Sequence, residues 1–420
     1  MGEYVVRCVG CGAIQPDYAL TCSCPNGSSL LRAYYASKRL ILRDFPGIWK
    51  FYEWLPVRGT SKAGESSITY KSAGLARELG LKNLYISFSG YWPEKNASML
   101  SCSFKDLEAP PTMQRLAELG DNLTLVVASA GNTARAFASV SSITGQKIML
   151  FVPENALHRM WLTTEKGPIT LVAVRGDYYD AILAAEKVQS QRGFMPEGGA
   201  RNIARRDGMG TVMLEAALKI GEIPQHYFQA VGSGTGGISA WEAAMRLIDD
   251  GRFGRRLPML HLAQNVPNAP IYYAWIGREM ELNKQLCPTD MYDDVLFNRR
   301  PPYSIRGGVK DAFGAAGGRV YGITNNDAAD AKRLFEESEG IDILNAPAVA
   351  VAALIQAIES GSKLGSESNP ESPVVGPNDI ILLNITGGGV SRLKEDFTLN
   401  ILQPDATISG PEEAIELIGG

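Results

Sequence analysis

The sequence predicts an α/β protein with mainly parallel sheets, built as two lobes with a short cysteine-bearing extension at its N-terminus. Three observations support this prediction. Short apolar runs alternate with stretches of helical spacing, which is typical of a doubly wound sheet. Glycine supplies 44 of the 420 residues and punctuates the turns between these segments. Hydrophobic residues make up 45% of the chain and charged residues 20%, so a large core can form.

The alternation begins near residue 120 and continues into the C-terminal part of the chain. Short, continuous apolar runs predict buried strands, and apolar residues at helical spacing predict helices. Strands are expected at residues 123–128, 147–152, 169–174, 226–231, 259–264 and 380–385. Helices are expected at residues 133–143, 179–191, 209–220 and 238–248.

Clusters of proline and glycine near residues 105–120 and 192–210 indicate breaks between the lobes. The expected division has an N-terminal extension, a large domain made of two segments, and a smaller, mobile domain between those segments. Their limits are residues 1–45, residues 46–110 with 195–420, and residues 111–194. A polar stretch at residues 361–377 is expected to be a surface loop.

The charge and hydropathy patterns exclude several classes of protein. The formal net charge is −4, and no basic stripe of the kind found in nucleic-acid-binding proteins is present in the sequence. The longest apolar run, residues 346–355, is too short to span a bilayer. The first residues lack the basic and apolar segments of a signal peptide. We therefore expect a cytoplasmic protein that binds neither nucleic acid nor membrane.

Cys8, Cys11, Cys22 and Cys24 lie together near the N-terminus, which is not the pattern of a secreted disulfide framework. The Cys8-x2-Cys11 pair resembles a zinc knuckle, whereas Cys22-x-Cys24 is one residue shorter than the usual ligand spacing. The sequence favours a hairpin without metal, and zinc stays open as the alternative. No metal is expected among the catalytic residues.

The densest glycine cluster lies between a predicted strand and a predicted helix. It consists of Gly232, Ser233, Gly234, Thr235, Gly236 and Gly237. Glycines let backbone N–H groups wrap an anion, and the helix that follows adds its positive N-terminal end, so this loop predicts a phosphate cradle. A dinucleotide-binding fold is disfavoured because the next strand ends in Gln264 and Asn265 instead of an acidic residue. A glycine-rich turn without ligand is the plain alternative.

A single lysine carries the second motif. Lys105 follows the apolar residues Met99, Leu100 and Phe104. Such a setting can desolvate the amine, which lowers the pKa of a lysine and favours its nucleophilic form. Most lone lysines are simply solvated surface residues, and that is the alternative here.

Two further motifs follow predicted strands. Ser129, Gly131 and Thr133 lie around Asn132 at a strand-to-helix turn whose backbone N–H groups suit a carboxylate, and Asn132 could donate to a phenolate-type oxygen. A helix cap is the alternative for this turn. Thr386 begins a Thr-Gly-Gly-Gly stretch after the last strand, for which a tight turn is the alternative.

Together and in this order, the four motifs resemble the tryptophan-synthase-like (fold type II) family of pyridoxal-phosphate enzymes, and within it the threonine synthase group. The resemblance extends over most of the chain from about residue 60. It implies that pyridoxal 5′-phosphate is the cofactor, that Lys105 holds it as a Schiff base and that residues 232–237 surround its phosphate. It further implies that Asn132 lies beside the cofactor 3′-oxygen and that Thr386 faces the pyridine nitrogen. The turn at Ser129, Gly131 and Thr133 would hold the substrate carboxylate.

The sequence departs from threonine synthases around these motifs. Residues 64–69 read Gly-Glu-Ser-Ser-Ile-Thr where threonine synthases carry Gly-Glu-Gly-x-Thr-Pro. Residues 34–56 and 85–108 instead resemble the cysteate synthase family. That resemblance implies a β-replacement on O-phospho-L-serine with sulfite, giving L-cysteate and phosphate for coenzyme M synthesis, in an enzyme expected to be a homo-oligomer. Action on phosphohomoserine, as in threonine synthase or a related lyase, and a non-catalytic metabolite-binding paralogue are the alternatives.

The expected reaction must handle two oxyanions, the phosphate that leaves and the sulfite that adds. Arginine is the usual partner of such groups. Candidate cations are Lys62, Arg135, Arg201, Arg205, Arg206, Arg299, Arg300 and Arg306. The sequence does not choose among them.

Overall fold

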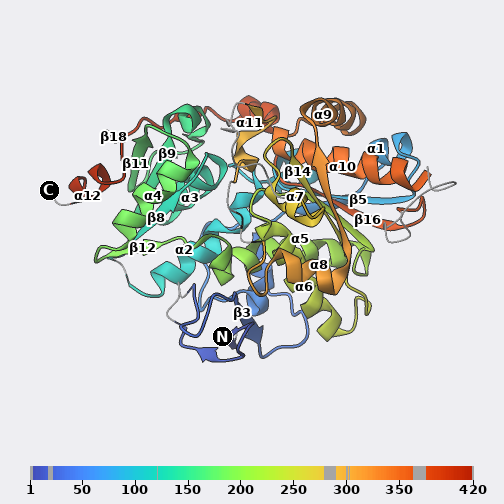
Figure 1. Cartoon of the computed structure of the whole chain (residues 1–420), viewed down its shortest axis with the longest axis horizontal. Helices are drawn as coiled ribbons and strands as arrows, with labels where there is room; N and C mark the ends of the chain where they lie inside the picture. The colour runs from blue at the N-terminus through green and yellow to red at the C-terminus, as the bar shows by residue number, and fades with distance from the viewer. Residues whose placement is uncertain are drawn as a thin grey trace.

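The computed structural model describes residues 3–17, 22–120, 122–278, 290–298, 301, 303–362 and 375–418. Two mainly parallel sheets stand side by side, each with helices on both faces, and a small antiparallel sheet lies below them in Figure 1. The expected loop at 361–377 lies mostly outside the described residues, as do Arg299 and Arg300.

The larger sheet has the strand order β15-β14-β13-β16-β5-β4, and its neighbours are parallel except for the antiparallel pair β4 and β5. Its central strands are buried along almost their whole length, as expected for a parallel sheet covered on both faces. The strands are β4 (Ile68–Lys71), β5 (Asn83–Phe88), β13 (His226–Ala230), β14 (Met259–Asn265), β15 (Gly318–Ile323) and β16 (Ile380–Ile385).

Helices cover both faces of the larger sheet (Figure 1). One face packs against α5 (Ile203–Ile220), α6 (Thr235–Asp250) and α8 (Val309–Ala316). The other packs against α1 (Gly74–Glu78), α9 (Asn325–Glu339) and α10 (Asn345–Ser362). The short α7 (Pro270–Trp275) lies against β14 and β15, and α11 (Val390–Asp396) follows β16.

The smaller sheet has the order β12-β8-β9-β11-β18, and every neighbouring pair in it is parallel. Its strands are β8 (Thr124–Ala128), β9 (Ile148–Pro153), β11 (Ile169–Val174), β12 (Phe194–Pro196) and β18 (Ala406–Ile408). The helices α2 (Ala109–Ala117) and α3 (Asn132–Thr144) pack on one face, and α4 (Tyr178–Gln189) and α12 (Glu413–Glu416) on the other. Short elements at its rim are the 3-10 helix η4 (Glu154–Arg159) and the paired strands β10 (Trp161–Leu162) and β17 (Asn400–Ile401).

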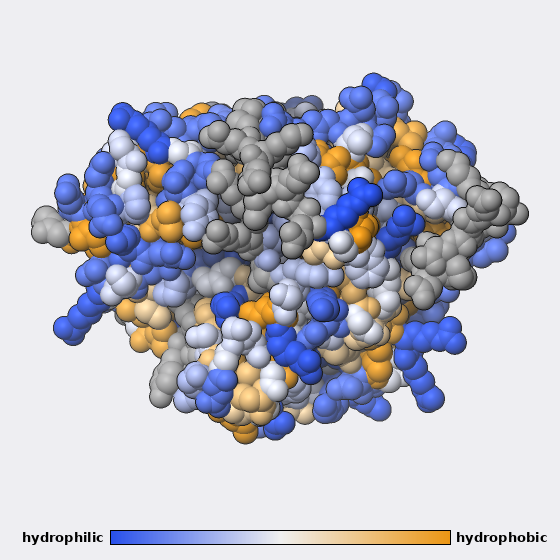
Figure 2. Space-filling model, viewed as in Figure 1, coloured by the Kyte–Doolittle hydropathy of each residue, from blue (hydrophilic) through white to orange (hydrophobic). Residues whose placement is uncertain are grey.

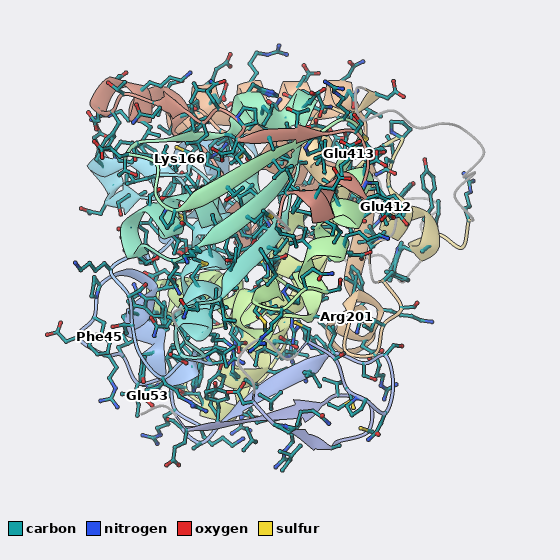
Figure 3. The ribbon with its side chains drawn as sticks, turned by 90° about the vertical axis from the view of Figure 1, so that its left-hand side faces the viewer. Phe45, Glu53, Lys166, Arg201, Glu412 and Glu413 are labelled. Carbon is teal, nitrogen blue, oxygen red and sulfur yellow. The ribbon has the colours of Figure 1, made fainter. Side chains whose placement is uncertain are left out.

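The last part of the chain returns to the smaller sheet. Strand β18 pairs with β11, and the Asp405 carboxylate just before it accepts a hydrogen bond of 2.7 Å from the Leu171 backbone N–H. Lys166 donates to the same carboxylate, and Figure 3 shows Lys166, Glu412 and Glu413 on this side of the molecule. The domain limits expected from the sequence stay a prediction, to which the structure adds that residues 400–416 pack with the smaller sheet.

The expected strands and helices are present, with their ends displaced by a few residues at most, apart from one helix start. Helix α5 begins at Ile203, whereas the sequence predicted a start at residue 209. The Asn202 side chain caps it by accepting a hydrogen bond of 2.9 Å from the Ala204 N–H. The first turns of this helix lack the apolar periodicity that marks a buried helix in a sequence. Their buried positions are taken by Arg205, Arg206 and Asp207, which form ion pairs.

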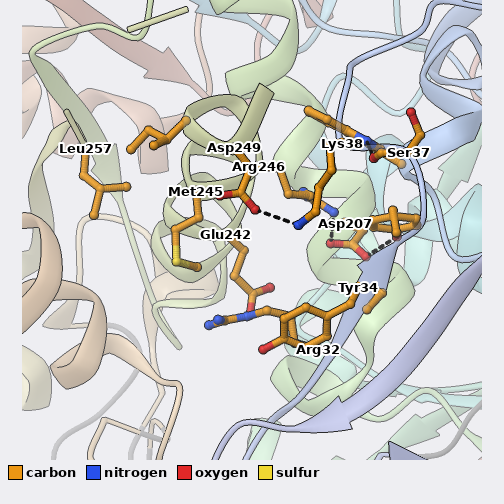
Figure 4. Close-up of a pocket in the computed structure, with 14 residues that line it drawn as sticks. Arg32, Tyr34, Ser37, Lys38, Asp207, Glu242, Met245, Arg246, Asp249 and Leu257 are labelled. Carbon is orange, nitrogen blue, oxygen red and sulfur yellow. Dashed lines mark hydrogen bonds and ion pairs between the residues drawn. The ribbon is translucent and has the colours of Figure 1, made fainter. Parts of the chain in front are cut away.

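The N-terminal extension is a sheet of β1 (Tyr4–Cys8), β2 (Ile14–Gln15) and β3 (Leu31–Tyr35), joined to the lobes through the 3-10 helix η1 (Gly47–Trp54). Its apolar residues share one core with α5 and α6. Polar contacts along β3 reinforce this packing: Tyr35 Oη donates to Asp207 at 2.6 Å, and Arg32 pairs with Glu242 at 2.9 Å. Figure 4 shows Arg32, Asp207 and Glu242 at a cavity of about 280 Å³ between β3 and α6, which Tyr35 also lines. The extension is therefore an integral part of the larger lobe.

The molecular surface is mixed in polarity. Figure 2 shows hydrophilic residues over most of one face, with smaller hydrophobic patches among them. Among the described residues, no helix has both the length and the apolar content that a membrane span requires.

The contact between β3 and α5 gives a stability prediction. Tyr35→Phe removes the hydroxyl that donates to buried Asp207, so we expect the free energy of unfolding in urea to fall by about 1–2 kcal/mol. Tyr85→Phe is the control, because the Tyr85 hydroxyl has no hydrogen-bond partner in the described part of the chain. Equal unfolding midpoints for Tyr35→Phe and wild type would show that this contact contributes nothing.

Candidate active site

A cavity of about 490 Å³ lies between the two lobes. Its size falls within the range of roughly 300–1,000 Å³ typical of small-molecule sites. The carboxyl ends of β8, β13 and β16 lead into it, which is where ligands bind in open parallel sheets. The residues singled out in the sequence line it, namely Lys105, Ser129, Gly131, Asn132, Thr133, Gly232, Ser233, Gly234, Thr235, Gly236 and Thr386. Gly237 is the exception, because it lies within α6 and faces Leu262.

Lys105 lies in the 3-10 helix η3 (Phe104–Leu107), where its backbone N–H donates to the Ser103 hydroxyl at 3.4 Å. Two backbone contacts tie this helix to the end of β16. Ser103 pairs with Gly387, and the Phe104 N–H donates to the Thr386 carbonyl at 3.0 Å. The Lys105 side chain is 21% exposed, and both Lys105 and Thr386 line the cavity.

Behind the amine runs a chain of buried charges that the sequence did not reveal. Lys105 Nζ lies 3.4 Å from the Glu108 carboxylate, which accepts a hydrogen bond of 2.6 Å from Arg205. Arg205 also pairs with Glu197. Glu108 is 0% exposed, so this carboxylate is fully withdrawn from solvent and lies between two cationic neighbours.

Burial and charge set the protonation of these groups. Burial lowers the pKa of Lys105, and Arg205 adds to this effect, while the negative charge of Glu108 opposes it. Burial raises the pKa of Glu108, but Arg205 and Lys105 outweigh that effect, so the pKa of Glu108 is lowered. The site therefore combines a firmly ionised carboxylate with an amine that loses its proton more readily than an exposed lysine.

The glycine loop joins β13 to α6 and presents backbone to the cavity. Gly234 has a φ of 82°, and a Cβ on it would lie 2.3 Å from the Val309 side chain. A Cβ on Gly236 would lie 2.1 Å from the Gln229 amide. The N-cap of helix α6, Gly234, has no side chain, and the Thr235 N–H donates to the Ser233 hydroxyl at 3.4 Å, so the N–H groups that follow in the first turn can receive an anion.

The floor beneath this loop is held by a relay of buried polar side chains. Asn384 Nδ2 donates to Tyr227 Oη at 2.8 Å, and Tyr227 Oη donates to the Gln229 carbonyl at 2.6 Å. Gln229 is the residue that leaves no room for a side chain at Gly236. The relay therefore fixes the path of the loop from the strand side.

The turn after β8 is fixed from both ends. Gly131 has a φ of 131°, and a Cβ on it would lie 2.7 Å from Arg159. Arg159 donates to the Ala130 carbonyl at 3.0 Å, and the Gly131 N–H donates to the Ser129 hydroxyl at 3.0 Å. The Asn132 side-chain oxygen accepts from Arg135 at 3.1 Å, which leaves its amide hydrogens as the groups available to a ligand.

Sequence reasoning missed Glu108, Glu197 and Arg159 as members of the site. Glu108 follows Lys105 by three residues, a spacing that could have drawn attention to it. Nothing local marks Glu197 or Arg159, because both reach the site through the packing of distant segments.

The structure shows which of the candidate cations line the cavity and which are paired elsewhere. Arg201 and Arg205 line the cavity. Arg135 donates to backbone carbonyls behind it, Arg206 pairs with Glu242, and Arg306 pairs with Asp311. The cavity of Figure 4 shares no lining residue with this one, and its charges pair with one another, as Lys38 does with Asp249.

Known proteins are similar to this chain in sequence and in fold. Residues 70–369 match the family described as pyridoxal-phosphate dependent enzymes. The chain is 54% identical over 418 residues to a cysteate synthase of Methanococcoides burtonii, covering 99% of this chain and 96% of the relative. The chain belongs to the cysteate synthase family of pyridoxal-phosphate dependent enzymes. Another member, from Methanothrix thermoacetophila, is 56% identical over 412 residues, covering 97% of this chain and 96% of that protein.

Solved structures confirm the predicted tryptophan-synthase-like fold (fold type II). An aspartate racemase described as pyridoxal 5′-phosphate-dependent superposes with a TM-score of 0.56 at 16% identity, covering 77% of this chain and 90% of the racemase. Maize serine racemase superposes with a TM-score of 0.54 at 14% identity, covering 79% of this chain and 91% of the racemase. The expectation of a pyridoxal-phosphate enzyme is likewise confirmed.

The residues of the cavity fit this cofactor. The glycine loop leaves its backbone open to a phosphate, because side chains would not fit at Gly234 and Gly236. Lys105 offers an amine of lowered pKa at the cavity wall. Arg205 Nε is buried without a hydrogen-bond partner among the described residues, as expected where an anion belongs.

The geometry of the glycine loop predicts how the substitution of one glycine by alanine changes the affinity for the cofactor. Gly234→Ala forces a side chain onto a positive φ and into Val309, so we expect the affinity for pyridoxal phosphate to fall at least about tenfold. Gly251→Ala at the other end of α6 is the matched control, because its φ is 81° and nothing lies within 4 Å of its Cβ position. The affinity of each variant is measured by titrating its apoenzyme with pyridoxal phosphate and following the absorbance of the bound cofactor. Equal affinities for the two variants would contradict the assignment of the loop.

Proposed function

We propose that this chain forms L-cysteate from O-phospho-L-serine and sulfite and releases phosphate. The observation that carries the proposal is its 54–56% identity, over nearly the whole length, to proteins named cysteate synthases. In this reaction phosphate leaves with the electrons of the Cβ–O bond, and the sulfur lone pair of sulfite forms the Cβ–S bond. The proton taken from Cα is returned there, so the balance needs no oxidant or reductant. A place in coenzyme M synthesis stays a prediction from the resemblance.

Lys105 is proposed to hold the cofactor and then to act as the base at Cα. Bound pyridoxal phosphate supplies an electron sink for the charge that develops at Cα. Because burial lowers the pKa of Lys105, the amine freed by the arriving substrate accepts the Cα proton on Nζ. The Glu108 carboxylate, 3.4 Å from Nζ, stabilises the ammonium until the proton returns to Cα.

The remaining cavity residues are proposed to bind and orient. Residues 232–236 would hold the cofactor phosphate with backbone N–H groups, and the Asn132 amide would donate to the 3′-oxygen. Thr386 would face the pyridine nitrogen, where a neutral hydroxyl does not stabilise a positive charge as a carboxylate does. The turn at Ser129, Gly131 and Thr133 would hold the substrate carboxylate.

Arg201 is the cation that we propose for the incoming anions. It lines the cavity and has no carboxylate within ion-pair distance among the residues that the structure describes. Figure 3 shows it between the smaller sheet and the N-terminal strands. Arg205 is held by Glu108 and Glu197 through its two terminal nitrogens, and its Nε has no hydrogen-bond partner among the described residues. Arg201 would therefore receive the phosphate of phosphoserine and later the sulfite.

Family membership indicates small-molecule substrates. A cytoplasmic location and a homo-oligomeric state stay predictions from the sequence. Gel filtration with light scattering on the purified holoenzyme measures the second of these directly.

The choice of substrate is tested by product analysis. We expect the holoenzyme given phosphoserine and sulfite to release phosphate and cysteate in equal amounts. Phosphohomoserine is offered separately, with and without sulfite. Phosphate released from phosphohomoserine alone, with threonine as the product, would contradict cysteate formation and favour the threonine synthase alternative.

The ion pair beside Lys105 predicts a shift in pH dependence. Glu108→Gln removes the negative charge that raises the pKa of Lys105, so the amine stays neutral to lower pH. We expect the acidic limb of the kcat profile to move down by about one pH unit, whatever the change in the maximal rate. Glu108→Asp keeps the charge and should leave the limb near its wild-type position. A limb that is unmoved or shifted upward in Glu108→Gln would refute the role of Lys105 as the base.

A further inference from the structure

We propose that Cys8, Cys11 and Cys24 bind a structural zinc ion in the N-terminal extension. Their Sγ atoms all lie within 4.8 Å of one another, and those of Cys11 and Cys24 are 3.7 Å apart. Tetrahedral zinc with Zn–S bonds of about 2.3 Å sets its sulfur atoms about 3.8 Å apart. The Cys11 and Cys24 sulfur atoms therefore have the spacing of two zinc ligands, and the Cys8 sulfur lies close enough to reach the same ion.

Two tight turns bring the sulfur atoms together. In the first, the Gly12 N–H donates to the Cys8 carbonyl at 2.9 Å, and the Cys8 N–H donates to the Ala13 carbonyl at 3.0 Å. In the second, the Gly27 N–H donates to the Cys24 carbonyl at 3.3 Å. Backbone hydrogen bonds from residues 10 and 11 also reach Cys8, and one from Asn26 reaches Cys24.

The structure alters the ligand set that the sequence suggested. The short Cys22-x-Cys24 spacing disfavoured a site of all four cysteines. Here Cys22 points elsewhere, since a Cβ on Gly198 would lie 2.5 Å from its sulfur. Cys11 is exposed, so a solvent molecule can occupy the fourth position of the zinc on that side.

The proposed zinc would hold a segment that supports the active site. Cys24 is two residues from Cys22, which contacts the turn at Gly198. That turn leads into η5 (Gly199–Arg201), and residues 198–201 line the active-site cavity. A zinc ion that links β1 to Cys24 would thus hold in place the segment that packs against the turn leading to Arg201.

Metal analysis of the full-length protein, purified without chelator, tests this proposal. We expect about one zinc per chain in the wild type and in Cys22→Ser, and less than about a tenth of that in Cys24→Ser. On replacing zinc with cobalt, we expect a thiolate-to-cobalt charge-transfer band in the wild type and in Cys22→Ser. If Cys24→Ser does not fold, chelation of the wild type should lower its thermal unfolding midpoint, and added zinc should restore it.

Three results would overturn the proposal. The first is wild-type protein with no stoichiometric zinc and no cobalt band. The second is loss of the metal in Cys22→Ser, which would contradict the three-ligand set. The third is a Cys11–Cys24 disulfide in unreduced protein, seen as two fewer alkylated thiols, since bonded sulfurs lie only about 2.05 Å apart.

Discussion

The burial of one lysine amine beside one carboxylate is the constraint on which the site depends. A charged ammonium is costly away from water unless a partner compensates it. Glu108 supplies that partner at 3.4 Å, and Arg205 in turn holds Glu108. Lys105 can therefore alternate between a neutral amine and an ammonium, which is what a group that takes and returns a proton must do.

The fold supplies this arrangement by bringing strand ends together. The 3-10 helix that carries Lys105 is tied to the end of β16 through Ser103 and Phe104. The glycine loop follows β13, the neighbour of β16 in the sheet. The turn at residues 129–133 comes from the smaller sheet, so the cavity closes only where both lobes meet. Arg205 and Glu197 link the start of α5 to β12, which couples the charge chain behind Lys105 to both lobes.

Local features of the sequence were enough to predict the parallel sheets and most of the cavity. The loop at 232–237 is recognisable because its glycines gather between a predicted strand and a predicted helix, although the side chains that leave no room at them include the distant Val309 as well as Gln229. The early start of α5 and the return of β18 to the smaller sheet escaped prediction, because ion pairs and edge pairing across the fold decide them. Glu197, Arg159 and the direction of Cys22 depend likewise on distant segments that no local pattern encodes. The limits of the domains and the roles of the site residues stay predictions.

The central role proposed for Lys105 is tested most directly by locating the lysine that holds the cofactor. Borohydride reduction of the holoenzyme fixes the cofactor to that lysine, and peptide mass spectrometry then identifies it. We expect one phosphopyridoxyl group per chain on the peptide that contains Lys105, and its loss when phosphoserine and sulfite are added before reduction. A modification on any other lysine, or none in enzyme that makes cysteate, would contradict the central role given to Lys105.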